Sequence, residues 1–90
     1  MSDEKKLFKS EEQKSRSEVS EFLQQLATRV AEGQVVFGQG QQEIALQLPE
    51  RLVLEVQVED EDKGRRGIQH SLEIELKWFD GDQGGSLELR

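Results

Sequence analysis

Hydrophobic and polar residues follow two different periods along this chain, and the period changes at Gly33. Between Ser15 and Gly33 the apolar residues recur at alternating steps of three and one, which is the spacing of one face of a helix. These positions are Val19, Phe22, Leu23, Leu26, Ala27 and Val30. The pattern predicts one amphipathic helix over 15–33 that packs against a neighbour on one side only.

Both ends of this predicted helix carry recognisable capping signals. Ser15 followed by Glu18 fits a capping box, in which each side chain bonds the other residue's backbone N–H, although Ser17 could serve as the cap instead. Gly33 suits the left-handed residue that closes many helices.

After Gly33 the apolar residues recur at every second position, which is typical of strands with one buried face. Glycine-rich, proline-containing or charged turns separate the segments, and these connections are too short for parallel crossovers. We therefore expect an α+β fold with one amphipathic helix packed on a four- to five-stranded antiparallel meander sheet. The predicted strands span 34–37, 43–48, 52–59 and 68–78.

The two ends of the chain are expected to differ from this body. Residues 1–4 are predicted to be disordered, and 5–9 either add a short edge strand anchored by Leu7 or Phe8, or fray. Residues 80–90 are expected to form a C-terminal turn followed by either a last strand over 86–90 or a loose tail.

The order of these elements resembles the small prokaryotic amphi-Trp domain over residues 5–79. That family pattern is a Ser-capped helix with a Leu-Ala step, a closing Gly, a strand-Pro-strand segment and an alternating strand that ends in Trp. The matching positions here are Ser15, Leu26, Ala27, Gly33, Pro49, the alternation from Leu72 to Leu76, and Trp78. The resemblance implies no catalytic residue, substrate or cofactor, and the segment after Phe79 lies outside the pattern.

Composition excludes several functional classes. The net charge is -7, so neither nucleic acid nor an anionic membrane surface is expected as a partner. The chain has no cysteine, which removes disulfides, thiolate metal sites and thiol nucleophiles. The first ten residues lack the apolar core of a signal peptide, and a cytoplasmic location is expected.

The segment "DGDQGG" matches the start of a calcium loop, with Asp80 at its first position and Asp82 at its third. The match then fails, because the fifth position is Gly84 and the twelfth, where a bidentate Glu belongs, would be residue 91. Glu88 stands at the ninth position and does not replace that ligand in the usual geometry. We therefore predict a glycine-rich turn and no metal site, with weak calcium binding through Asp80, Asp82 and Glu88 as the alternative.

Two further features bear on binding. Trp78 closes the apolar face of its strand, which favours a core role, while the alternative is a half-exposed indole that contacts a partner. The polar face should carry Glu55, Glu73 and Glu75, and an acidic surface of this kind either keeps a small protein soluble or binds a basic partner.

These observations predict no enzyme and no cofactor, because the chain has a single histidine and no nucleophile motif. The leading hypothesis is a small, non-catalytic protein-interaction module of a prokaryotic cytoplasm. Its candidate interaction surface comprises Glu55, Glu73, Glu75 and Trp78, and its protein partner and oligomeric state are left open.

Overall fold

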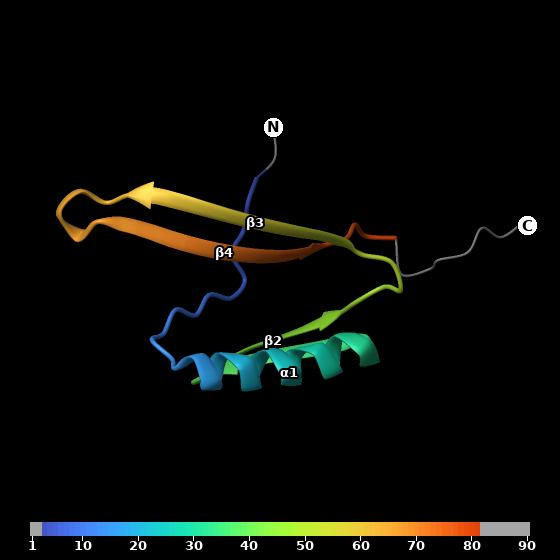
Figure 1. The fold of residues 1–90 in the computed structure, drawn as a ribbon. Helices are drawn as coiled ribbons and strands as arrows, with labels where there is room; N and C mark the ends of the chain where they lie inside the picture. The colour runs from blue at the N-terminus through green and yellow to red at the C-terminus, as the bar shows by residue number, and fades with distance from the viewer. Residues whose placement is uncertain (1–2, 82–90) are drawn as a thin grey trace, which may run out of the picture. The chain divides into compact units, whose positions relative to one another are not determined.

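The computed structural model describes residues 3–81 and contains one helix and four strands within them (Figure 1). Their order is α1 (Arg16–Glu32), β1 (Gln34–Gln39), β2 (Gln42–Gln47), β3 (Val53–Asp62) and β4 (Ile68–Lys77), with a 3-10 turn at Gly64–Arg66 between the last two strands. The expected α+β class is confirmed. The chain divides into two compact units, Met1–Leu48 and Pro49–Arg90.

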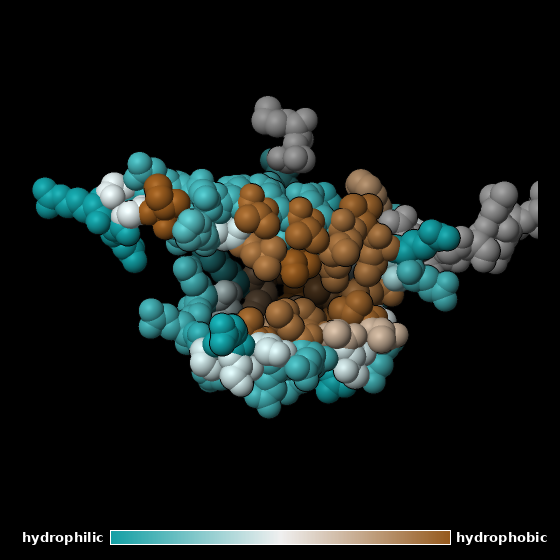
Figure 2. All heavy atoms as spheres, in the orientation of Figure 1, coloured by the Kyte–Doolittle hydropathy of each residue, from teal (hydrophilic) through white to brown (hydrophobic). Residues whose placement is uncertain are grey.

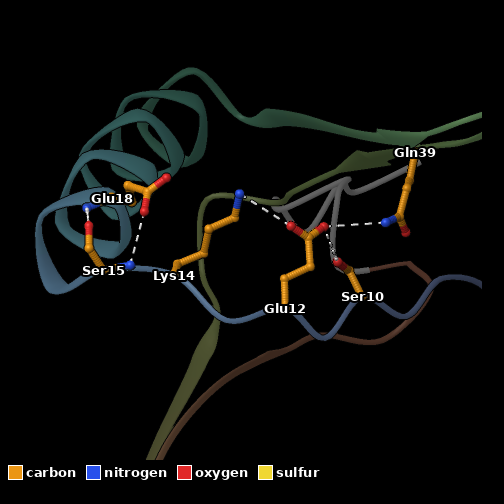
Figure 3. A network of polar contacts seen from close by, with 6 residues as sticks. All are labelled: Ser10, Glu12, Lys14, Ser15, Glu18 and Gln39. Carbon is orange, nitrogen blue, oxygen red and sulfur yellow. Dashed lines mark hydrogen bonds and ion pairs between the residues drawn. The ribbon is translucent and has the colours of Figure 1, made fainter.

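Helix α1 begins and ends where the sequence predicts. The Ser15 side chain accepts a hydrogen bond from the Glu18 backbone N–H at 3.0 Å, and the Glu18 carboxylate accepts one from the Ser15 N–H at 3.0 Å (Figure 3). These reciprocal bonds satisfy two donors that the first helical turn leaves open. Gly33 closes the helix in the left-handed conformation, with φ at 86°, and its N–H donates to Arg29 and Val30 carbonyls.

The capping box makes stability sensitive to acid. The hydrogen bond from the Ser15 backbone lowers the pKa of the Glu18 carboxyl below its ordinary 4.5, and the Ser15 hydroxyl and Lys14 act in the same direction. A pKa that is lower in the folded chain stabilises it above the ordinary value and ceases to do so as the pH falls through the lowered pKa.

We expect Glu18→Gln to lower the urea midpoint at pH 7 and to have no effect once the pH lies below the lowered pKa of Glu18. Glu21→Gln removes the same charge from the exposed side of the same helix and should shift the midpoint less at pH 7. Urea melts followed by circular dichroism between neutral and acidic pH test this. A Glu18→Gln effect that is constant across that range would contradict it.

The first unit builds its small core between α1 and the β1–β2 hairpin (Figure 1). Val35 is 4% exposed and is the buried hydrophobic residue of the described part of the chain. The register pairs Val35 with Leu46 and Phe37 with Ile44, which places these four side chains on one face. Val36 lies on the opposite face of β1 and is 51% exposed. Helix α1 packs on β1, and its Leu26 is half-buried. Both observations fit this arrangement.

The segment before α1 is attached to β1 by one aromatic contact and one polar contact. Phe8 stacks on Phe37 with ring centroids 5.7 Å apart. Glu12 accepts a hydrogen bond from the Gln39 side chain at 3.3 Å and pairs with Lys14 at 3.3 Å (Figure 3). Residues 5–9 form no strand, so the expected edge strand is wrong, although Phe8 does anchor this segment.

The second unit is a long two-stranded hairpin. β3 and β4 pair antiparallel over ten positions each, from Val53 opposite Lys77 to Asp62 opposite Ile68. The turn is closed by a hydrogen bond from the Gly64 N–H to the Asp62 carboxylate at 2.8 Å and by one from the Lys63 N–H to the Gly67 carbonyl at 2.8 Å.

The single four- to five-stranded meander is not confirmed. The described residues form two separate two-stranded sheets, β1–β2 and β3–β4. The segment from Leu48 to Leu52 between them is not a strand, and Pro49 within it has no N–H to donate to a ladder. The predicted last strand over 86–90 lies outside the described residues.

Candidate functional site

The polar face of the β3–β4 hairpin brings together three of the four predicted interaction residues. The register sets Glu55 directly opposite Glu75 and Gln57 opposite Glu73, so alternation places all four side chains on one face. All are exposed to solvent. We call this surface, formed by Glu55, Gln57, Glu73 and Glu75, the acidic face.

One base partly neutralises the acidic face. The Lys77 ammonium lies 2.7 Å from a Glu55 carboxylate oxygen and 3.7 Å from one of Glu75. The hydrogen bond and charge of Glu55, reinforced by Glu75, raise the pKa of Lys77. Because like charges directly opposite each other destabilise a sheet, Lys77 offsets the repulsion between Glu55 and Glu75. Glu73 makes no contact with this base that would offset its charge in the same way.

A shallow depression lies on this part of the hairpin. Its volume is about 320 Å³, and its lining comprises Glu55, Gln57, Glu73, Ile74 and Glu75. Ligand pockets usually have mostly apolar walls, whereas this lining is mainly carboxylate and amide. The depression is therefore suited to a cationic side chain rather than to an apolar small molecule.

Trp78, the fourth predicted residue, does not belong to the acidic face. It follows β4 directly and continues the alternation of Leu72, Ile74 and Leu76, which point to the other side. Its residue surface is half-buried, while the neighbouring Phe79 is 82% exposed.

Of the three residues of the calcium alternative, Asp80 lies within the described part of the chain and is exposed. Asp82 and Glu88 lie outside the described residues. Within residues 3–81, no group of three or more histidine, aspartate or glutamate side chains is placed to hold a metal ion. Within the same residues, α1 is too short and too polar to span a membrane.

The hairpin also holds a pair that the sequence pattern did not predict. Asp60 lies opposite His70, and its carboxylate oxygen is 2.6 Å from His70 Nδ1. Both residues have even numbers and therefore share the face of Leu54, Val56 and Val58. The position of the turn at 63–67 determines that Asp60 pairs with His70. The sequence did not give this position, because the turn could be centred at several places in the run "EDEDKGRRG".

Comparison with known proteins gives one match. The family model of the Amphi-Trp domain matches residues 1–90. This match extends beyond the resemblance seen over 5–79 and includes the segment after Phe79. Comparisons with curated proteins and with solved structures gave no match.

Proposed function

The chain belongs to the Amphi-Trp domain family, and from this premise we propose that it is a small, non-catalytic protein-interaction module of a prokaryotic cytoplasm. Its acidic face binds a basic segment of a protein partner. The observation that carries this proposal is the register of the hairpin, which gathers Glu55, Glu73 and Glu75 on one exposed surface with Lys77 as the adjoining base.

The charges on this face suit a cationic segment rather than a single ion. Lys77 already occupies the space between Glu55 and Glu75, which leaves Glu73 and the outer oxygens of the pair for an incoming lysine or arginine. Ten-residue strands present this surface along a regular ladder, so an extended basic peptide can meet successive carboxylates. Such binding weakens as salt is added, because exposed charges are screened within about 8 Å at physiological ionic strength.

The test is an NMR titration of the full chain with a peptide rich in lysine and arginine. We expect the amide signals of Glu73 and Glu75 to shift, and the double variant Glu73→Lys and Glu75→Lys to bind at least about tenfold more weakly, a change of about 1.4 kcal/mol. The variant should keep its helical circular dichroism, because both side chains are exposed.

A matched control separates a site from net charge. Glu21→Lys with Glu43→Lys makes the same change of net charge on exposed positions of the first unit. This control should bind the peptide almost as well as the unaltered chain. Equal losses in both double variants would show that the peptide responds to net charge alone, and the acidic face would then be only a solvated surface.

A further inference from the structure

The opposite face of the β3–β4 hairpin is apolar, and no other described helix or strand of the second unit covers it. Three directly opposed pairs form it: Leu54 with Leu76, Val56 with Ile74, and Val58 with Leu72. Leu76 is half-buried, and the other five side chains are between 58% and 72% exposed. Figure 2 shows hydrophobic side chains gathered along this hairpin. We call these six residues the apolar hairpin face.

An exposed apolar face of this size is unfavourable in water unless another surface packs on it. Burying one aliphatic side chain contributes about 2.5 kcal/mol. At about 25 cal/mol per Å², this corresponds to roughly 100 Å² of apolar surface for each side chain. Five of them expose about 500 Å², which is as large as the largest apolar patch of a typical monomer. A two-stranded hairpin is also only marginally stable in water unless its apolar face packs against something.

We propose that the apolar hairpin face is the interface of a homodimer, in which the same face of a second copy covers it. Two such faces bury about 1,000 Å² together, which is the area where specific interfaces begin. A two-fold interface requires a patch that complements itself, and three opposed pairs of similar aliphatic side chains meet that requirement. Two sheets packed in this way lie about 10 Å apart, with their strands nearly aligned.

The charges at the end of the face favour one orientation of the two copies. Asp60 and His70 follow the apolar pairs on the same face, and one further pair, Asp62 with Ile68, lies between them and the turn. A two-fold axis along the strands lays β3 of each copy over β4 of the other, so Asp60 of one copy faces His70 of the other. An axis across the strands would instead lay this polar pair over the apolar end of the partner hairpin, where it would lose water without a new partner.

This arrangement leaves the acidic face of each copy pointing outward. The dimer does not depend on the proposed binding of a basic segment, because the two use opposite faces of the hairpin. A dimer would present two acidic faces, and a partner with two basic segments would gain from engaging both.

The test is the mass of the full chain in solution. Sedimentation equilibrium from about 1 to 100 μM should give the dimer mass at the upper end. Ile74→Lys should raise the dissociation constant of the dimer at least about 100-fold, because each interface would bury two unpaired ammonium groups. Glu73→Lys, the neighbouring position on the opposite face, should leave the dissociation constant within about twofold.

Val58→Lys provides a second variant that should disturb folding of the single chain less than Ile74→Lys, because Val58 is 72% exposed and Ile74 is 58% exposed. It should also weaken the dimer while keeping its circular dichroism. A monomer at every concentration overturns the proposal, and hydrogen exchange then tells whether another part of the same chain protects the hairpin amides. A dimer that withstands both lysine variants also overturns it, because the interface would lie elsewhere. Peptide binding at the acidic face is read separately, so either proposal can fail alone.

Discussion

Replacing Val35 by aspartate is expected to destabilise the protein by at least about 3 kcal/mol and to lower its melting temperature clearly. Val35 is 4% exposed, and its carboxylate replacement would lie on the inner face of β1, against helix α1. A buried charge without a partner costs at least about 3 kcal/mol. A chain of this length has a total stability of only about 5 to 13 kcal/mol, so the loss consumes a large part of it.

The neighbouring residue supplies the control for this result. Val36 lies on the opposite face of β1 and is 51% exposed, so Val36→Asp should cost less than about 1 kcal/mol. Thermal melts followed at 222 nm should place Val35→Asp at least about 12 °C below the unaltered chain. Equal melting temperatures for the two variants would show that Val35 is not the centre of the core.

Phe8→Ala is expected to release the segment before α1 from the first unit. The half-buried Phe8 ring stacks on Phe37 at 5.7 Å, and it is the aromatic anchor of residues 3–14. Losing its buried area and the ring contact should cost about 2 kcal/mol, which is less than the cost for a fully buried ring. The segment would then still contact β1 through the hydrogen bond between Glu12 and Gln39.

Limited proteolysis measures this release directly. Cleavage by trypsin at Lys9 and Lys14 should become faster in Phe8→Ala, because a loosened segment fits the protease more readily. Leu7→Ala is the control, since Leu7 is 60% exposed and its loss should leave the cleavage rate nearly unchanged. Unchanged cleavage in Phe8→Ala would mean that the stacking does not hold the segment.

Local features were predictable because residues within one helical turn determine them. The helix stripe, the capping box of Ser15 with Glu18 and the left-handed Gly33 all depend on neighbours at most four positions away. The alternation along β3 and β4 likewise determines which side chains share a face, whatever the strands pair with. Glu55, Glu73 and Glu75 could therefore be assigned to one side of a sheet from the alternation alone.

Pairing and exposure depend on residues far apart in the sequence, and the short-range pattern does not contain them. An alternating strand shows that one face is apolar but not what covers it, so a single meander and two separate hairpins are equally consistent with the pattern. The Phe8 contact with Phe37 and the Asp60 contact with His70 arise only once β1 and the turn at 63–67 are in place.

The sequence by itself thus determined the helix, its caps, the two-faced strands and the family resemblance, because each rests on local spacing. Only the tertiary structure decided which strands pair and that Lys77 lies between Glu55 and Glu75. It also decided that most side chains of the apolar hairpin face are exposed. The physical reason is that strand pairing joins two separate alternations into one surface, and this pairing depends on the turn between the strands as well as on the alternation.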